Sequence, residues 1–236
     1  MTTRANRLGE SLDRAYRHWR ERGVLETSED HHEAAPRMTI AVSRERGAGG
    51  GSVARMLSQR LDWPLYDREL MEHISEKSGI QQDLLSELDE SRPTWFSEII
   101  KSLGTERQMT AAGYAALLHK LVAALYMRGN CIVLGRGAAQ ILPADHTLRV
   151  RLIAPHEHRV DRVAEQFANR NEAIKHVKQV DHDRAIFVKE YFHKDVNNSH
   201  DYDLTIDTSR FDLIACCELI ERALVARMAV VKQVEA

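Results

Sequence analysis

The feature that most constrains the fold of this 236-residue chain is a glycine cluster between an apolar run and a helical pattern. Residues 41–56 read AVSRERGAGGGSVARM. The apolar, partly β-branched run at 38–42 predicts a buried strand, and Val53, Met56 and Leu57 follow the glycines at helical spacing. A strand that passes through glycines into a helix can cradle phosphate, because uncrowded backbone N–H groups and the helix N-terminus both attract anions. The sequence therefore predicts a phosphate-binding loop.

This loop differs from the usual pattern G-x-x-x-x-G-K-[ST]. Aligned on Gly49, it has Arg44 in place of the first glycine and Gly50 in place of the lysine. Gly51 then takes the Ser/Thr position, and Ser52 follows one position late. Because a guanidinium group can bind phosphate as lysine does, we expect Arg44 to supply the missing charge, with Arg46 as the second candidate. Taken alone, the loop is equally compatible with a structural turn. The residues predicted to bind nucleotide phosphate are Arg46, Gly47, Ala48, Gly49, Gly50, Gly51 and Ser52.

The rest of the chain alternates between strand and helix patterns. Four further short segments have the apolar composition of strands, at 63–66, 131–135, 147–154 and 202–209. Helical patterns separate them, including a stretch at 155–192, and a last helix is predicted from Leu213. Strands separated by helices imply parallel crossovers, so the fold class predicted is a three-layer α/β/α sandwich.

Residues 1–36 precede this main domain, which we place at 37–236, and they are predicted to form an amphipathic helix and an acidic linker. Leu8 and Leu12 share one helical face that arginines surround. The stretch at 26–36 is acidic and ends in proline, as linkers do. We expect the helix to dock on its own domain or on a second subunit, which makes a homo-oligomer possible, rather than on a membrane.

Composition is that of a globular protein, with 43% hydrophobic and 29% charged residues. The formal net charge of −2 gives no overall attraction to nucleic acid or to a membrane, and neither is expected as a partner. The three cysteines have no disulfide pattern, and no secretory signal or membrane-spanning run is visible, so we expect a cytoplasmic protein. No histidine or cysteine set has the spacing of metal ligands, and no metal-binding residue is predicted.

Five motifs together resemble the cytidylate kinase-like family, a branch of the P-loop nucleoside monophosphate kinases. The first is MTIAVSRERGAGGGSVARMLSQRLDWPLYDREL, which is similar to the family's S-R-E-x-G-[SA]-G-G loop, also without the lysine. The others are CIVLGRGAAQIL, LRVRLIAPHEHRVDRV, VDHDRAIFVKEYF and YDLTIDTSRFDLIACCELI, in the expected order over about residues 38–225. One position departs: the family often has a basic residue where this chain has Gly51, so the cradle loses a positive charge.

Polar residues follow two of the predicted strands, at the ends where open α/β sheets bind ligands. Asp67 and Arg68 come just after the second strand. Arg136 lies between two glycines after the third, where its guanidinium can reach a phosphate without crowding. The resemblance implies that Arg136 anchors a monophosphate; a surface salt bridge is the alternative. The predicted acceptor-binding residues are Asp67, Arg68, Arg136 and Asp181.

Phosphoryl transfer needs cations over the equatorial oxygens of the transferred group. Arg159 and Arg162 lie at i,i+3 spacing, as do Asp181 and Arg184, so each pair shares a helical face. The D-x-D-R segment at 181–184 resembles the place where the family's lid meets the base and phosphates, although a helix-stabilising ion pair is the alternative. The predicted catalytic residues are Arg44, Arg159, Arg162 and Arg184.

The resemblance implies a P-loop kinase-type sheet with a helical acceptor-binding insertion and a helical lid, in a kinase-like domain at 37–236. It also implies ATP-dependent phosphorylation of a nucleoside monophosphate, CMP or dCMP, with Mg²⁺ accompanying the nucleotide. Two alternatives stay open at this point. One is a regulatory nucleotide-binding module with weak or no transfer, and the other is a P-loop kinase for a different small acceptor.

Overall fold

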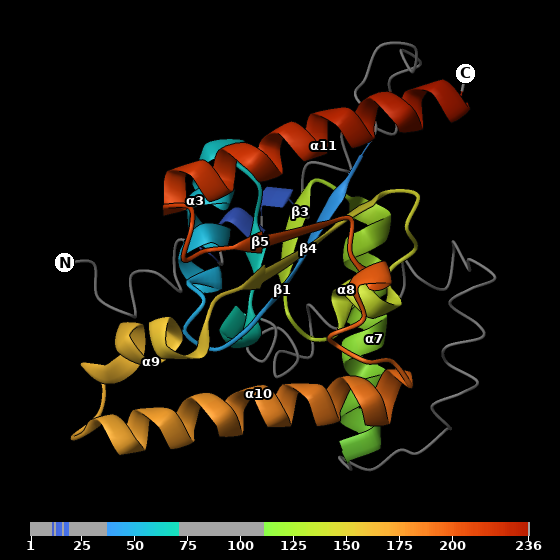
Figure 1. Cartoon of the computed structure of the whole chain (residues 1–236). Coiled ribbons are helices and arrows are strands. Elements are labelled where there is room, and N and C mark those ends of the chain that lie inside the picture. The colour runs from blue at the N-terminus through green and yellow to red at the C-terminus, as the bar shows by residue number, and fades with distance from the viewer. Residues whose placement is uncertain (1–10, 12, 16, 19–36, 71–110, 236) are drawn as a thin grey trace.

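The computed structural model describes residues 11, 13–15, 17–18, 37–70 and 111–235 (Figure 1). At its centre is a five-stranded sheet in the order β2-β3-β1-β4-β5. Every neighbouring pair is parallel, as the alternation of strand and helix patterns predicted. The strands are β1 (Thr39–Arg44), β2 (Leu65–Tyr66), β3 (Cys131–Leu134), β4 (Thr147–Ile153) and β5 (Leu204–Asp207).

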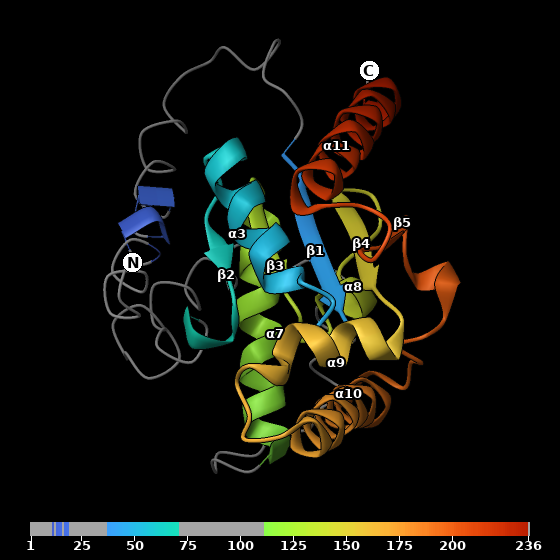
Figure 2. The same ribbon diagram turned by 60° about the vertical axis from the view of Figure 1, so that its left-hand side comes forward.

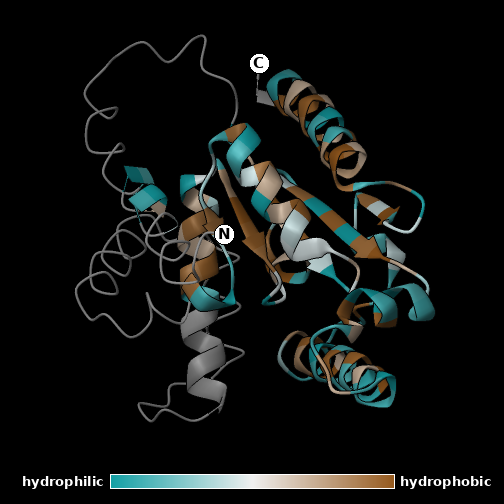
Figure 3. Ribbon diagram, turned by 90° about the vertical axis from the view of Figure 1, so that its left-hand side faces the viewer, coloured by the Kyte–Doolittle hydropathy of each residue, from teal (hydrophilic) through white to brown (hydrophobic). Residues whose placement is uncertain are grey.

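Helices cover both faces of the sheet (Figure 2). On one face lie α3 (Gly50–Leu61) and α11 (Leu213–Glu235), and on the other lie α7 (Ala111–Arg128) and α8 (Ala138–Ile141). Strand β1 shows the reason, because Ile40 and Val42 join the core under α3 and α11 while Ala41 joins the core under α7. Strands buried on both faces are apolar along their length, and the central strands are mainly hydrophobic (Figure 3). The three-layer fold class is thus confirmed.

Two further helices lie across the carboxyl ends of the strands, at the position of the predicted lid (Figures 1 and 2). They are α9 (His156–Ala164) and α10 (Arg170–Phe192), so the helical stretch predicted at 155–192 is divided in two. The division falls where the Asn169 side chain accepts a hydrogen bond from the Glu172 amide and caps α10. Val160 and Val177 belong to a small core between the two helices. The predicted acceptor-binding insertion falls mainly at 71–110, outside the described residues.

The described N-terminal residues contact the same domain beside β2. His18 Nδ1 lies 3.2 Å from the Tyr66 hydroxyl, and His18 Nε2 lies 2.8 Å from the Gly129 carbonyl oxygen. Arg14 Nη1 donates to Ser58 Oγ at 3.0 Å, and Ala15 is buried. This part of the N-terminal segment therefore rests on its own chain, while its role in assembly stays a prediction. Within the described ranges, no helix is long and apolar enough to cross a bilayer.

A short 3₁₀ turn, η1 (Ser199–Asp201), precedes β5. Just after it the Tyr202 hydroxyl donates to the Val196 carbonyl at 2.8 Å and accepts from Gln140 Nε2 at 2.7 Å. At the far end of β5, Asp207 Oδ1 accepts from the Ser209 amide at 2.9 Å. These contacts fix the loops that approach the carboxyl end of the sheet from the β5 side.

Candidate functional site

The glycine-rich loop joins β1 to α3 at the carboxyl end of the sheet. Gly47 (φ 85°) and Gly49 (φ 75°) both adopt left-handed conformations, and Gly49 is the N-cap of α3. A Cβ atom on Gly47 would collide with the backbone carbonyl group of Arg159 on α9. Glycine at this position therefore lets the loop pack directly against the first lid helix.

The side chain of Arg44 runs from the end of β1 along the loop to the turn after β3. A Cβ atom on Gly50 would lie 2.6 Å from Arg44 Cβ, and one on Gly135 would collide with Arg44 Nη1. Burial lowers the pKa of Arg44, and the guanidinium groups of Arg184 and Arg136 lower it further, whereas Asp67 raises it. The arrangement gathers positive charge where an anion would stabilise it.

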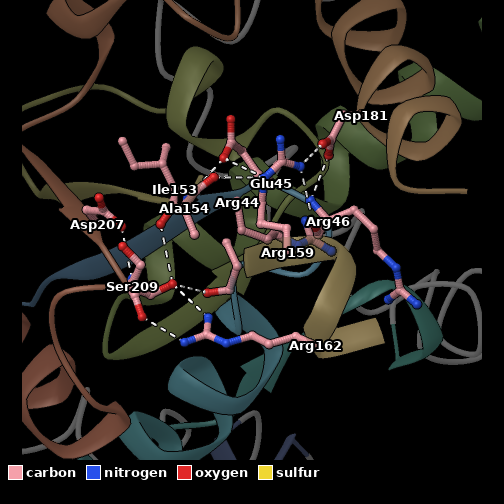
Figure 4. Close-up of polar contacts among 12 residues, drawn as sticks. Arg44, Glu45, Arg46, Ile153, Ala154, Arg159, Arg162, Asp181, Asp207 and Ser209 are labelled. Atoms are coloured by element: carbon pink, nitrogen blue, oxygen red, sulfur yellow. Dashed lines mark hydrogen bonds and ion pairs between the residues drawn. The ribbon is translucent and has the colours of Figure 1, made fainter. Parts of the chain in front are cut away.

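Arg159 ties α9 to the loop (Figure 4). Its Nε forms an ion pair with Glu45 Oε2 at 3.2 Å and donates to the Ala154 carbonyl at 2.9 Å. Its Nη1 donates to the Arg46 carbonyl at 3.2 Å and forms an ion pair with Asp181. Glu45 Oε2 also accepts from the Ala154 amide at 3.1 Å. A single guanidinium thus connects the loop, the end of β4 and α10.

Arg162 lies one turn along α9 from Arg159 (Figure 4), and it holds the other end of the loop through Thr208. Its Nη1 donates to Thr208 Oγ1 at 2.9 Å, and its Nη2 donates to the Thr208 carbonyl at 2.7 Å. The hydroxyl of Thr208, which is 2% exposed, donates in turn to the Ala48 carbonyl at 2.8 Å. Arg159 and Arg162 share one face of α9, as their spacing predicted, and both bind protein groups in this structure.

Asp181 on α10 accepts a hydrogen bond from the Arg46 backbone amide at 2.7 Å. It also lies 3.6 Å from Arg184 Nη1, the i,i+3 ion pair that the sequence offered as an alternative. Arg184 Nη1 donates to the Arg44 carbonyl at 3.0 Å, and burial lowers the pKa of Arg184. The D-x-D-R segment of α10 therefore packs against the loop, and its Asp181 carboxylate lies between Arg159 and Arg184.

A cavity of about 520 Å³ opens between the loop, α8 and α10. Its charged lining among the described residues consists of six arginines and three carboxylates, so cations are in excess. Five of these arginines were predicted from the sequence, three as catalytic and two as acceptor-binding residues, and the structure brings all five to a single cavity. The arginines are Arg44, Arg68, Arg136, Arg151, Arg159 and Arg184, and the carboxylates are Glu45, Asp181 and Asp183.

The turn after β3 presents Arg136 to this cavity. Arg136 has a φ of 57° between Gly135 and Gly137, which are left-handed as well. The left-handed region is costly for a residue with a side chain, so the surrounding structure holds Arg136 there. Strain of this kind occurs at ligand-binding positions, in keeping with the predicted acceptor-binding role.

Three predicted residues have side chains directed elsewhere. The Arg46 side chain extends away from Arg44 (Figure 4), and its Nη2 donates to Gln166 Oε1 at 3.0 Å. Asp67 accepts from the Leu70 amide at 3.0 Å and caps the turn after β2. Ser52 Oγ accepts from Arg55 rather than standing free toward the cavity. The contribution of Arg46 to the loop is therefore its backbone, while its charge lies to one side.

Arg55 is a residue that the sequence reasoning missed. Its Nη2 donates to Ser52 Oγ at 3.3 Å, and its Nη1 would lie 3.4 Å from a Cβ atom on Gly51. Residues 51 and 55 are one helical turn apart, so Arg55 covers the position at which the resemblance led us to expect a basic residue. The i,i+4 spacing of Gly51 and Arg55 could have predicted this contact from the sequence.

Arg151 was missed as well, because the pattern at 147–154 predicts only a strand. It is 6% exposed, with Nη1 donating to Ser43 Oγ at 2.8 Å and Nη2 to Asn197 Oδ1 at 3.0 Å. An arginine inside a buried strand is uncommon unless it is paired, and this was the available signal. Across the described chain, no three His, Cys, Asp or Glu side chains gather as metal ligands.

The parallel sheet, the glycine-rich loop after β1 and the lid helices across the strand ends define a P-loop kinase-type fold. The chain belongs to the cytidylate kinase-like family, whose model matches residues 39–210. Its family is therefore one of nucleotide and small-molecule kinases. No curated protein shows significant similarity to the sequence.

Solved structures resemble the chain at low identity. An uncharacterized protein from Eubacterium ventriosum is 19% identical, with a TM-score of 0.65, over 81% of this chain and 99% of that chain. Shikimate kinase from Bacteroides thetaiotaomicron is 15% identical, with a TM-score of 0.44, over 80% and 99%. Shikimate kinase from Acinetobacter baumannii, in complex with shikimate, is 15% identical, with a TM-score of 0.40, over 83% and 95%. The first of these shares the fold, and the other two are looser likenesses.

Proposed function

We propose that the protein transfers the γ-phosphoryl group of ATP to a nucleoside monophosphate, with CMP or dCMP as the acceptor that its family suggests. The observation that carries the proposal is the path of Arg44, which begins against Gly50 of the loop and ends against Gly135 of the turn before Arg136. One guanidinium thus lies between a phosphate cradle and a second cationic group, as transfer between two phosphate-bearing molecules requires.

On the donor side, the residues present fit a nucleoside triphosphate. The backbone from Gly47 to Ser52 and the N-terminus of α3 form the phosphate cradle. Arg55 supplies the cation at the position of Gly51, and Arg44 supplies the one that Gly50 lacks. Mg²⁺ bound with the nucleotide would neutralise phosphate charge, and the loop would offer it the Ser52 hydroxyl once that group is released from Arg55.

On the acceptor side, Arg136 and Arg68 bind the monophosphate. Both line the cavity, Arg68 just after β2 and Arg136 in the turn after β3. Guanidinium groups suit a phosphate dianion because their N–H donors match its oxygens in pairs. Asp181, which lies among the arginines, limits their mutual repulsion, and in this proposal it accepts a hydrogen bond from a sugar hydroxyl of the acceptor.

Transfer in this site relies on position and charge rather than covalent chemistry. Arg44 and Arg184 stabilise the charge that develops on the transferred group, and Arg151 adds to the positive field from the strand below. Arg159 and Arg162 position the loop through Asp181, Glu45 and Thr208. Lid helices α9 and α10 limit water in the cavity, which disfavours hydrolysis of ATP.

The regulatory alternative has one observation in its favour. The Asp181 carboxylate accepts the Arg46 amide of the loop and pairs with Arg159, so an internal anion already engages cationic groups at the cradle. A protein that binds nucleotide without efficient transfer would show this arrangement permanently. A kinase would release it when substrates bind.

A coupled assay for ADP formation tests the proposal, with Mg²⁺-ATP and CMP, dCMP, UMP, AMP or GMP as acceptor. We expect acceptor-dependent turnover, greatest with CMP or dCMP, and a loss of about tenfold to thousandfold in kcat for Arg44→Ala. Measurable ATP binding by calorimetry without turnover on any acceptor would overturn the kinase proposal in favour of the regulatory one. Turnover on a non-nucleotide acceptor alone would favour a kinase for another small molecule.

A further inference from the structure

A second cavity lies at the opposite end of the sheet from the loop. It measures about 340 Å³, and Arg37, Pro64 and Asn130, which precede β1, β2 and β3, form part of its lining. The glycine-rich loop and the cavity beside it lie at the carboxyl ends of the same strands. The two cavities share no lining residue and lie at opposite ends of the strands.

Cationic side chains dominate this second cavity. Four arginines line it, Arg14, Arg17, Arg37 and Arg128, and Asp62 is the one carboxylate among the described residues of the lining. Asp62 lies 3.7 Å from Arg14 Nε, but its side chain is 75% exposed, so it offsets one arginine only weakly. Such an excess is notable in a chain whose formal net charge is −2.

Several of these groups are held in place by the fold. Arg128, 6% exposed, donates to the His18 carbonyl at 3.0 Å, and Arg14 donates to Ser58 Oγ at 3.0 Å. The His18 ring lies between the Tyr66 hydroxyl and the Gly129 carbonyl. Two of the four guanidinium groups, those of Arg14 and Arg128, are thus held at the concave space, so they lose little side-chain freedom when an anion arrives.

We infer that this cavity, the N-terminal anion pocket, binds a small phosphate-bearing molecule. Guanidinium forks match phosphate oxygens in pairs, and Trp63, Leu61 and Pro64 provide an apolar wall beside them. The enclosed volume suits pyrophosphate or a nucleotide, whereas a nucleic acid or a membrane would need a broad basic surface, which the net charge of −2 disfavours.

Binding at the N-terminal anion pocket would link two parts of the chain. Arg14 and Arg17 come from the N-terminal segment, while Arg37 and Arg128 come from the main domain. Figure 2 shows the described part of the N-terminal segment beside α3 and β2. A ligand that contacts both sets of arginines binds best when the segment is docked, so it would raise the stability of the docked form. This site is independent of the proposed kinase activity.

The test uses the whole 236-residue chain with inorganic pyrophosphate as the probe. Calorimetry on the wild type should give two sites, one of which Arg44→Ala weakens. The double variant Arg17→Ala/Arg37→Ala removes two exposed side chains of the N-terminal anion pocket and should weaken the other site at least tenfold. Pyrophosphate should still raise the Tm of Arg44→Ala through the N-terminal anion pocket. Adding Arg17→Ala/Arg37→Ala to that variant should abolish this remaining rise. Arg222→Ala, an exposed arginine on α11, is the matched control and should keep both sites.

The double variant should retain its ADP-forming activity, so failure here and failure of the proposed function are separate results. Trp63→Phe distinguishes a nucleotide from pyrophosphate as the ligand of this pocket. The substitution reduces the apolar wall, so it should weaken the binding of a nucleotide severalfold and leave the binding of pyrophosphate unchanged. Equal stoichiometry and affinity in the double variant and the wild type would overturn the inference. So would binding that appears only after Glu29→Gln/Asp30→Asn, because the linker carboxylates would then be the natural occupants of the cavity.

Discussion

Arg44 fills the space into which a side chain at Gly50 would extend, with its Cβ only 2.6 Å from an ideal Cβ on that glycine. The usual phosphate loop has the opposite arrangement, with a glycine at the first position and a lysine at the later one. In this loop the cation is on the strand side and the glycine on the helix side. The two positions are therefore coupled, since a long side chain fits at one only if the other is small.

The coupling predicts that restoring the standard lysine alone is harmful. Gly50→Lys should displace Arg44 and lower kcat/KM for ATP by about tenfold or more, because crowding shifts groups in the cradle. Arg44→Gly/Gly50→Lys, which recreates the standard pair, should recover most of the loss. Steady-state kinetics on the wild type, Arg44→Gly, Gly50→Lys and Arg44→Gly/Gly50→Lys complete a double-mutant cycle. Additive losses in that cycle would contradict the coupling.

The sequence predicted the backbone at this site but not the directions of its side chains. The strand before the glycines and the helix after them follow from local periodicity, and periodicity also predicted the parallel sheet. Whether Arg44 points into the loop and Arg46 away from it depends on what α9, α10 and β3 place beside them. Those contacts join residues more than 90 positions apart, as between Arg44 and Gly135 or Arg46 and Asp181.

Thr208 illustrates the same limit. The pattern at 202–209 predicted a strand, yet nothing local indicates a hydroxyl that bridges Arg162 and Ala48. The division of the lid into α9 and α10 was in principle readable, because Asn169 is a favourable N-cap residue. Helix caps and turns can thus be predicted from the local sequence, whereas contacts between distant segments require the three-dimensional structure.

Arg55 is predicted to contribute to ATP use in place of the basic residue absent at Gly51. Arg55→Ala should raise KM for ATP by about tenfold to 150-fold, since a hydrogen bond to a charged group contributes roughly 1.5–3 kcal/mol. Initial rates at varied ATP measure this, with Arg222→Ala as the control for loss of one exposed arginine. Gly51→Arg/Arg55→Ala moves the charge back by one turn and should restore ATP affinity. Unchanged KM in Arg55→Ala would show that the guanidinium only caps Ser52.

Thr208 is predicted to couple the stability of the loop to the last strand. Thr208→Val keeps the side-chain shape but leaves the Ala48 carbonyl and Arg162 Nη1 without the hydroxyl that joins them. Loss of these buried contacts should lower the free energy of unfolding by about 1–3 kcal/mol and raise KM for ATP. Urea unfolding and initial rates measure the two effects. Thr208→Ser, which retains the hydroxyl, should keep KM near the wild-type value, and an equal rise in both variants would contradict the prediction.

His119 on α7 is predicted to make the fold less stable in mild acid. The residue is 4% exposed and stacks on Phe192 with ring centroids 4.6 Å apart. Burial lowers the pKa of His119 to about 4, from about 6.5 in an unfolded chain. Between these two values the unfolded state binds the extra proton, so stability is complete above pH 6.5 and falls as pH falls toward 4.

At pH 5.0 this one group should lower the free energy of unfolding by about 2 kcal/mol relative to pH 7.5. Urea unfolding at the two pH values measures the loss in the wild type. His119→Leu removes the titrating group, so the loss in that variant should be smaller by the same amount. His200→Leu changes an exposed histidine and should keep the wild-type loss. If His119→Leu lost as much stability as the wild type, the ring would not be the group that resists protonation in the folded state.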